Sequence, residues 1–260
     1  MCATCGCGGP APTGPDGHEH DHDHAHPHDH DHKHETKAPS GNTVLQVEQA
    51  ILAGNDHIAS HNRALLNRRH TRAFNLISSP GAGKTTLLEK TLTALRERNV
   101  SCAVIEGDQA TDLDAQRIAR TGVSVFQIET GRSCHLDAQQ VQRALGHIDV
   151  PDHGLLFIEN VGNLICPTEF KLGEHERVTI VSTAEGHDKP AKYPLAFQTA
   201  TAVVISKIDL LPYLDFDLVE AKRVIHGLNP GAPIFELSSR TGDGMEAWLS
   251  WLQQNMQNHG

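Results

Sequence analysis

The sequence predicts an α/β fold in which one mostly parallel sheet is covered by helices on both faces. Between residues 71 and 260, short apolar segments alternate with amphipathic segments of helical period, and this alternation is typical of a buried parallel sheet. A glycine-rich turn follows the first predicted strand at residues 79–83, where open α/β sheets bind their ligands. A single domain of about 190 residues accommodates all of these elements.

The predicted elements follow one another in a regular order. The expected strands are Ala73–Ser78, Ser101–Glu106, Val123–Ile128, Leu155–Glu159, Val178–Ser182, Ala202–Ile205 and Pro233–Leu237. The expected helices are Lys84–Glu97, Leu113–Arg120, Cys134–Leu145, Leu195–Thr201, Leu218–Leu228 and Gly244–Met256. An earlier helix is expected from Thr43 to near Arg69, with Val47 and Ile51 among its apolar positions. We therefore divide the chain into a tail (residues 1–40), an N-terminal helical segment (41–70) and the α/β domain (71–260).

Residues 1–40 differ in composition from the rest of the chain. They are rich in Gly, Pro, His and Asp and contain almost no apolar side chain larger than Ala. Such a segment cannot bury enough surface to offset the entropy of ordering, so we expect a disordered tail. Nine of the 19 histidines alternate with other residues there, at His18, His20, His22, His24, His26, His28, His30, His32 and His34.

Composition excludes several classes of protein. The formal net charge of −10 argues against a nucleic-acid partner. No run of about 18 apolar residues occurs, so we expect no membrane-spanning helix. The N-terminus lacks the apolar core of a secretory signal, and six cysteines in 260 residues do not make a disulfide scaffold. We therefore expect a cytoplasmic, reducing location.

The turn after the first strand predicts a phosphate-binding loop. It reads Ser-Ser-Pro-Gly-Ala-Gly-Lys-Thr-Thr from Ser78 to Thr86, and the glycines permit backbone N–H groups to approach a polyphosphate. Lys84 would contact the β- and γ-phosphates, and Thr85 would bind Mg²⁺. The predicted nucleotide-binding residues of the loop are Gly81, Ala82, Gly83, Lys84, Thr85 and Thr86. The usual pattern begins with Gly where this chain has Ser78, but its core is intact and indicates a P-loop domain.

A second motif indicates which nucleotide base the predicted phosphate-binding domain recognises. Residues 206–209 read Ser-Lys-Ile-Asp, close to the guanine-recognition pattern Asn-Lys-x-Asp, with Ser206 in place of Asn. The carboxylate of Asp209 can accept hydrogen bonds from guanine N1–H and from the exocyclic amino group, which adenine does not present together. Lys207 would pack its stem over the base, and Ser239 would supply a backbone contact to guanine O6. These residues favour GTP over ATP and therefore a GTPase.

Two acidic residues that follow strands are candidates for the hydrolytic site. Asp108 follows the second predicted strand, and Glu159 ends the fourth, three residues before Gly162. One would hold Mg²⁺, directly or through water, and the other would orient the attacking water. We assign these roles jointly to Asp108 and Glu159, with Lys84 as the third catalytic residue. A helix cap or a surface charge is the competing interpretation of each acid.

Three groups of residues have the composition of metal sites, and two lie in the tail. Cys2, Cys5 and Cys7 place three thiolates within six residues. With the α-amino group or a backbone amide they would make a square-planar Ni²⁺ site. The nine tail histidines, interleaved with carboxylates, would hold several Ni²⁺, Zn²⁺, Cu²⁺ or Co²⁺ ions as a store. An idle reactive tail and an expression tag are the competing interpretations.

The third group joins Cys134 and His135, expected at the start of a helix, with Cys166. Both segments follow strands at the nucleotide edge of the predicted sheet, so they could converge into a Cys/His/Cys site with an open or partner-supplied fourth position. Buried cysteines are also common core residues, and this alternative stays open on spacing alone. Cys102, within an apolar strand, is expected to be such a core residue.

Four stretches together carry a specific resemblance. They are Cys2–Cys7, Ser78–Thr86, Gly131–Ala138 and Glu159–Pro167. These stretches resemble the HypB family of hydrogenase nickel-incorporation GTPases, and the similarity covers the first seven residues and the chain from about residue 42 onward. The resemblance implies a GTPase that delivers Ni²⁺ to the large subunit of NiFe hydrogenase. It also implies tight nickel binding at Cys2, Cys5 and Cys7 and a weaker Ni²⁺ or Zn²⁺ site at Cys134, His135 and Cys166.

The resemblance further implies partners. These are HypA, a zinc-containing nickel-delivery protein, and the precursor of the hydrogenase large subunit. Dimerisation promoted by GTP or metal is implied as well, with Leu210 and Leu214 matching the interface leucines of the family, although core packing is the alternative for both. Only some members carry a His tail, which here suggests storage. The rival hypotheses are a nickel GTPase for another enzyme, such as the urease accessory protein, and a metal store with a vestigial GTPase.

Overall fold

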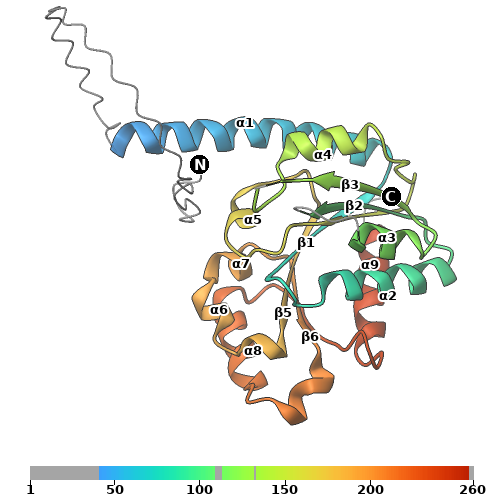
Figure 1. Cartoon of the computed structure of the whole chain (residues 1–260), viewed down its shortest axis with the longest axis vertical. Helices are drawn as coiled ribbons and strands as arrows, with labels where there is room; N and C mark the ends of the chain where they lie inside the picture. The colour runs from blue at the N-terminus through green and yellow to red at the C-terminus, as the bar shows by residue number, and fades with distance from the viewer. Residues whose placement is uncertain (1–40, 109–112, 132, 258–260) are drawn as a thin grey trace, which may run out of the picture. The chain divides into compact units, whose positions relative to one another are not determined.

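A seven-stranded parallel sheet forms the centre of the part of the chain that the structure, a computed structural model, describes: residues 41–108, 113–131 and 133–257 (Figure 1). The strands are β1 (Arg72–Ser78), β2 (Cys102–Asp108), β3 (Ser124–Glu129), β4 (Leu155–Glu159), β5 (Glu176–Ser182), β6 (Ala202–Ser206) and β7 (Ile234–Glu236). Their spatial order is β3-β2-β4-β1-β5-β6-β7, and every neighbouring pair is parallel. The predicted α/β fold is confirmed.

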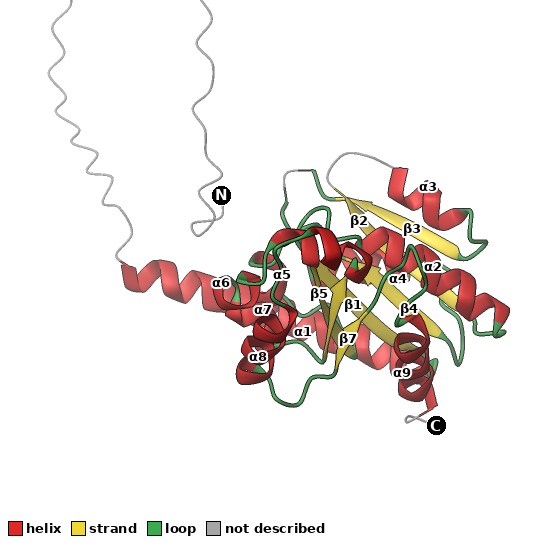
Figure 2. Cartoon of the chain, turned by 90° about the horizontal axis from the view of Figure 1, so that it is seen from below, coloured by secondary structure: helices red, strands yellow, loops and turns green. Residues whose placement is uncertain are grey.

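Helices lie on both sides of this sheet (Figure 2). They are α1 (Gly41–Arg68), α2 (Lys84–Glu97), α3 (Leu113–Ala119), α4 (Ala138–Leu145), α5 (Cys166–Glu169), α6 (Lys189–Lys192), α7 (Pro194–Gln198), α8 (Leu218–Leu228) and α9 (Met245–Gln257), with the 3₁₀ turns η1 (Thr183–Glu185) and η2 (Ile208–Tyr213). Successive side chains of a strand point to opposite faces of a sheet. Phe74 and Leu76 of β1 therefore pack with α2, α3 and α9, whereas Ala73 packs with α1 and α4, and Ile77 with α7 and α8.

Strand β1 lies where the strand order changes direction, between β4 and β5. Such a position opens a crevice at the carboxyl ends of the strands. Glu159 at the end of β4 is in register with Leu76 of β1 and with Glu106 of β2. The fold thus brings the phosphate loop, which follows β1, to the same edge as the acidic ends of β2 and β4.

The helix expected from Cys134 begins later than predicted. Asp137 accepts a hydrogen bond from Gln140 N at 2.7 Å, and the side chain of Gln140 accepts one from Asp137 N at 3.0 Å. This reciprocal cap starts α4 at Ala138, so Cys134 and His135 lie in the loop before the helix. The helix expected over Leu195–Thr201 is also displaced, because α7 spans Pro194–Gln198 with a proline in its first turn.

The predicted tail lies outside the described residues. Its proposed ligands Cys2, Cys5 and Cys7 and the nine tail histidines are therefore not part of the structural description, and the division of the chain into three regions stays a prediction. Among the described residues, no helix combines the length and the apolar character needed to cross a membrane.

Candidate nucleotide pocket and metal cluster

The phosphate loop connects β1 to α2 and is shaped by two glycines. Gly81 has a φ of 75° and Gly83 a φ of 94°, in the left-handed region that glycine adopts without a Cβ clash. Gly83 directly precedes the first turn of α2, where free N–H groups and the helix dipole favour an anion. The loop lines a cavity of about 530 Å³ with residues from the ends of β2 and β4, and all six predicted loop residues lie in its wall: Gly81, Ala82, Gly83, Lys84, Thr85 and Thr86.

Lys84, Thr85 and Glu159 form a polar contact in the wall of this cavity. Lys84 Nζ lies 3.3 Å from Glu159 Oε1, and Thr85 Oγ1 lies 2.7 Å from the same oxygen. Glu159 is only 2 % exposed, so the attraction is weakly screened by solvent. Sequence reasoning placed these residues near the nucleotide, and the structure adds that they contact one another directly.

A second buried carboxylate, Glu106, lies beside Glu159 on the neighbouring strand. Burial, followed by the negative charges of Glu159, Asp108 and Asp114, raises the pKa of Glu106 to about 8. Glu106 Oε2 and Glu159 Oε2 are buried without a hydrogen-bond partner among the described residues. Unpartnered buried carboxylate oxygens are costly, and Mg²⁺ prefers oxygen ligands. This donor set therefore fits Mg²⁺.

Asp108, the other predicted hydrolytic residue, ends β2 and lines the same cavity. Two residues of α3 also line it and were not predicted. Asp114 Oδ2 lies 3.1 Å from Thr85 Oγ1, and Arg117 Nη2 donates to Thr86 Oγ1 at 3.2 Å. Their spacing of three residues puts both on one face of a helix, a signal that could have identified them.

A smaller cavity of about 320 Å³ adjoins the phosphate loop and contains the residues predicted for the base. Asp209 Oδ1 accepts a hydrogen bond from Ser238 Oγ at 2.6 Å. Lys207, with a φ of 61°, donates to Gly81 O at 2.7 Å. Ser239 lines the same cavity. The structure thus brings both predicted base-binding segments together, with the Asp209 carboxylate oriented by a neighbour that was not predicted.

Ser206 occupies the position where the guanine pattern has Asn. Its hydroxyl lies 2.7 Å from Ala82 O and 3.4 Å from Val181 O, and the side chain is buried. A hydroxyl has one hydrogen to donate, and the shorter contact is to the phosphate loop. Ser206 therefore ties the end of β6 to that loop.

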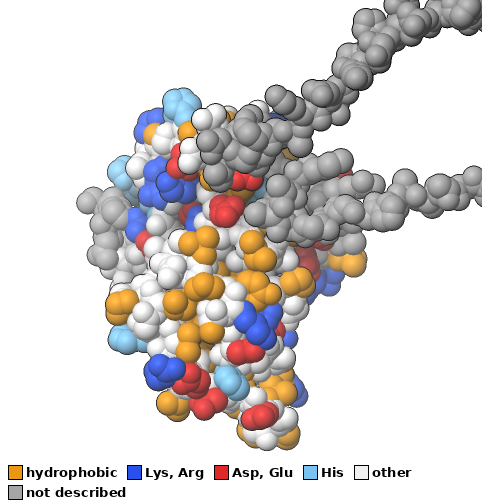
Figure 3. Space-filling model, turned by 90° about the vertical axis from the view of Figure 1, so that its left-hand side faces the viewer, with side chains coloured by type: hydrophobic (Ala, Val, Ile, Leu, Met, Phe, Trp, Pro, Cys, Tyr) orange, Lys and Arg blue, Asp and Glu red, His pale blue; other side chains and the backbone are white. Residues whose placement is uncertain are grey.

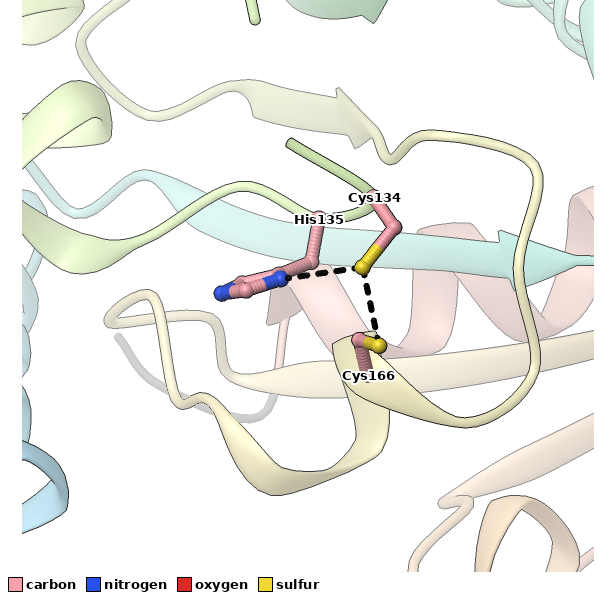
Figure 4. Close-up of side chains that lie close together, drawn as sticks. All are labelled: Cys134, His135 and Cys166. Carbon is pink, nitrogen blue, oxygen red and sulfur yellow. Dashed lines mark hydrogen bonds between the residues drawn. The ribbon is translucent and has the colours of Figure 1, made fainter. Parts of the chain in front are cut away.

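Cys134, His135 and Cys166 converge from two segments of the chain (Figure 4). Cys134 and His135 come from the loop before α4, and Cys166 is the first residue of α5. Cys134 Sγ lies 2.9 Å from Cys166 Sγ and 3.7 Å from His135 Nδ1, and the three ligand atoms all lie within 4.8 Å of one another. Thiolate and imidazole groups so arranged are typical ligands of Zn²⁺ and Ni²⁺. We call these three residues the metal cluster.

The surroundings of the metal cluster favour a neutral imidazole. Burial lowers the pKa of His135, and the charge of Asp137 opposes this only in part, so a ring nitrogen is available to a metal at pH 7. The ring also stacks on Phe170, with centroids 4.1 Å apart. Cys102 is different, since it packs against the main core and burial raises its pKa to about 12.

Asn160 connects the phosphate cavity to the metal cluster. It lines that cavity, and its Oδ1 accepts a hydrogen bond from Leu136 N at 3.1 Å, directly after His135 in the chain. On the other side, Asn163 forms an isolated β-bridge with Ser78, at the start of the phosphate loop. Both ligand-bearing segments are thus joined to the nucleotide pocket by single hydrogen-bonding steps.

The predicted interface leucines are only partly covered. Leu210 is half-buried and lines the base cavity, whereas Leu214 is 37 % exposed and follows Tyr213, which is 82 % exposed. Hydrophobic side chains gather in the middle of one face of the molecule (Figure 3). Large contiguous apolar patches are typical of contact surfaces, and dimerisation through Leu210 and Leu214 stays a prediction.

The fold and the phosphate cavity define the class of the protein as a P-loop nucleotide-binding α/β protein. Residues 72–236 match the family described as "CobW/HypB/UreG, nucleotide-binding domain". The chain is also 47 % identical to "Hydrogenase maturation factor HypB" of Escherichia coli (strain K12) over 220 residues. This alignment covers 84 % of this chain and 76 % of that protein. It belongs to the HypB family of hydrogenase maturation factors.

Two further relatives extend this comparison. The "Hydrogenase/urease maturation factor HypB" of Helicobacter hepaticus is 38 % identical over 83 % of this chain and 91 % of its own length. The crystal structure of HypB from Helicobacter pylori in complex with nickel superposes with a TM-score of 0.73 at 36 % identity, covering 79 % of this chain and 96 % of that one. The resemblance expected from the sequence motifs is confirmed.

Proposed function

We propose that this protein hydrolyses GTP and uses the hydrolytic cycle to deliver Ni²⁺ to the large-subunit precursor of NiFe hydrogenase. The observation that supports this best is the contact between the two sites, in which Asn160 lines the phosphate cavity and holds Leu136 beside the metal cluster. A change in the cavity therefore has a short route to a ligand-bearing segment. Membership of the HypB family and the nickel complex of the Helicobacter pylori relative support nickel as the cargo.

The nucleotide pocket would bind GTP from both ends. Backbone N–H groups of the loop and the Lys84 ammonium would bind the phosphates, while Asp209, oriented by Ser238, would accept hydrogen bonds from the guanine. Mg²⁺, held by Thr85, Asp108 and Glu159, would neutralise phosphate charge when bound. Lys84 would stabilise the charge that develops on the transferred phosphoryl group, and one of the two carboxylates would orient the attacking water.

The metal cluster would hold Ni²⁺ or Zn²⁺, with a fourth position open to water or to a partner protein. A nucleotide-dependent shift of the Asn160 contact would change the metal affinity, and a tenfold change in the dissociation constant requires only about 1.4 kcal/mol of coupling. Cys2, Cys5 and Cys7 would bind Ni²⁺ tightly, and the tail histidines would store further ions. The proposed partners are HypA, the hydrogenase precursor and a second copy of this chain, all in the cytoplasm.

The rate of Ni²⁺ release from the full-length protein to a chromophoric chelator tests this proposal. It is measured with Mg²⁺ alone, with GDP and with a non-hydrolysable GTP analogue. The matched control is the double variant Cys134→Ser/Cys166→Ser, which keeps every tail ligand. A nucleotide-dependent phase that disappears in the control supports a GTP-gated carrier. Identical rates in all three states contradict gating. The protein would then be a metal store joined to a GTPase, or a metal store without GTPase activity, and measurement of GTP turnover distinguishes these two.

A second function, maturation of urease, is favoured by one observation. The Helicobacter hepaticus relative is named a hydrogenase/urease maturation factor. Deleting the gene and assaying both nickel enzymes in the same strain separates the possibilities. Loss of hydrogenase alone supports the first proposal, and loss of urease alone contradicts it.

A further inference from the structure

Two buried asparagines of α1 connect the segments that carry the metal ligands. Asn55 is 8 % exposed and Asn62 is 2 % exposed. Neither lines the phosphate or base cavity, and neither is a ligand of the metal cluster. Buried polar side chains nearly always have hydrogen-bond partners. The partners of these two amides therefore indicate what the asparagines do.

Asn55 contacts both segments at once. Its Oδ1 accepts a hydrogen bond from Ala138 N at 2.9 Å, and its Nδ2 donates to Lys171 O at 2.8 Å. Ala138 follows His135 by three residues, and Lys171 follows Cys166 by five. Because a backbone N–H can only donate and a carbonyl can only accept, these partners fix the orientation of the amide.

Asn62 makes a similar connection about two helical turns further along the same face of α1. Its Nδ2 donates to Ala138 O and to Leu172 O, both at 2.9 Å. An amide nitrogen has two hydrogens to donate, whereas a carboxylate has none. Asparagine is therefore the side chain of this size that can hold two carbonyl groups from different segments together.

The backbone packs closely at this contact. A Cβ added at Gly173, which has a φ of 101°, would lie 2.6 Å from Asn62 Cβ and 2.8 Å from Ala59 O. Arg63 Nε also donates to Gly173 O at 2.8 Å. The same segment begins with Phe170, which stacks on His135. Helix α1 thus fixes a turn that itself contacts one of the metal ligands.

We propose that Asn55 and Asn62 are positioning residues for the metal cluster, and that α1 sets the separation of its two ligand-bearing segments. This inference rests on the proposed metal binding by Cys134, His135 and Cys166. Four hydrogen bonds from one helix hold the two segments, so their loss frees one segment to move against the other. The metal affinity then falls, while the nucleotide pocket, which neither asparagine contacts, keeps its affinity for GTP.

Alkylation of individual cysteines by iodoacetamide tests this in the full-length protein. Peptide mass spectrometry follows Cys134 and Cys166 separately, over a series of free Zn²⁺ concentrations set by a chelator buffer, so that metal bound by the tail does not affect the reading. Cys102 is the internal reference, because its partly buried thiol has a raised pKa and should react slowly while the chain is folded. The matched control is Asn67→Ala, which removes an α1 contact to His175, at 2.7 Å, that joins neither ligand-bearing segment.

We expect Asn62→Ala to raise the free Zn²⁺ needed for half-protection of Cys134 and Cys166 by about tenfold, the lower end of the loss caused by removing a group that supports a metal ligand. Asn55→Asp keeps the acceptor for Ala138 N but places a carboxylate oxygen, which cannot donate, against Lys171 O, so a rise is expected from this variant as well. Asn67→Ala should leave the midpoint unchanged, and GTP affinity should be unchanged in all three variants.

Equal midpoints in the wild type and in both test variants would overturn the inference. If Cys102 reacts rapidly in Asn62→Ala, that variant is unfolded, and Asn55→Asp decides the question in the same way. A wild type in which Zn²⁺ protects neither cysteine is a separate outcome. It would overturn the metal cluster itself, and with it the function proposed above.

Discussion

The nucleotide pocket and the metal cluster follow the carboxyl ends of the same sheet but are held in different ways. The phosphate-binding residues occupy one continuous turn between β1 and α2, whose shape comes from glycine backbone geometry. The metal ligands come from two segments, with Cys134 and Cys166 32 residues apart, and buried side chains of α1 and of Asn160, the residue after β4, hold the segment that follows Cys134. A site built from one backbone segment tolerates remote changes, whereas a site assembled from side chains of several segments depends on every contact that spaces them.

The largest effect is expected from Lys84→Ala. It removes the ammonium that would bind the phosphates and leaves the buried Glu159 without a counter-ion, so GTP turnover should fall by at least about 100-fold. The exposed Lys90 of α2 provides the control, Lys90→Ala, which should turn over GTP normally. Zinc protection of Cys134 and Cys166 should not change. Loss of that protection in nucleotide-free Lys84→Ala would show that the substitution disturbs the structure of the metal cluster and not the nucleotide pocket alone.

Cys166→Ser should have the converse effect. Replacing a thiolate by a hydroxyl removes a soft ligand, and the affinity of the cluster for Zn²⁺ or Ni²⁺ should fall by at least about 100-fold, more than the loss of a hydrogen bond to a ligand costs. GTP turnover measured without added transition metal should stay at the wild-type rate. Cys102→Ala, which alters a thiol outside the cluster, should leave the metal affinity intact.

A smaller effect is expected from Asp209→Asn. The amide offers one acceptor where the carboxylate offers two, so GTP affinity should fall about 10- to 100-fold, while xanthosine triphosphate, which presents a carbonyl in place of the amino group, should gain in relative affinity. Ser238→Ala removes only the group that orients Asp209 and should cost several-fold less. Competition binding with both nucleotides measures the change. An unchanged base preference in Asp209→Asn would show that Asp209 does not bind the guanine base.

The smallest effect concerns Cys102. Burial raises the pKa of its thiol from 9.0 to about 12, and the thiolate is the reactive form, so its alkylation rate should stay low from pH 7 to about pH 10. The unfolded chain ionises this thiol near its ordinary pKa, so the folded state binds more protons between pH 9 and 12. The free energy of unfolding should therefore fall as the pH rises through that window. A Cys102 that reacts as fast as Cys134 at pH 8 would contradict this.

The sequence predicted those parts of the molecule whose signals are local. Alternating strands and helices and the residues around Gly83 and Lys84 are readable from neighbouring positions. Glu106 could have been predicted as a site residue, because it lies two residues before Asp108 on the same face of β2. Its position beside Glu159, however, depends on how the strands pair. The start of α4 was predicted at Cys134, because the reciprocal cap between Asp137 and Gln140 was not recognised in the sequence.

Asn55 and Asn62 gave no sequence signal at all. Their partners are backbone groups 76 to 116 positions away. Every residue carries the same backbone groups, so the sequence does not show which of them an asparagine will contact. Polar residues within a predicted amphipathic helix are read as part of its exposed face. Only the packing of α1 against α4 and against the turn at Gly173 shows that these two amides are buried.

The contact between Lys84 and Glu159 has a consequence for the order of binding. Glu159 is the internal counter-ion of the loop lysine, so a triphosphate that attracts the ammonium leaves one buried carboxylate uncompensated. A divalent cation restores the charge balance. Nucleotide and cation are therefore linked ligands, each raising the affinity for the other by the same factor. The apparent dissociation constant for GTP should fall steeply as Mg²⁺ is added. GTP without Mg²⁺ should therefore bind more weakly than the Mg²⁺ complex, before any catalytic step takes place.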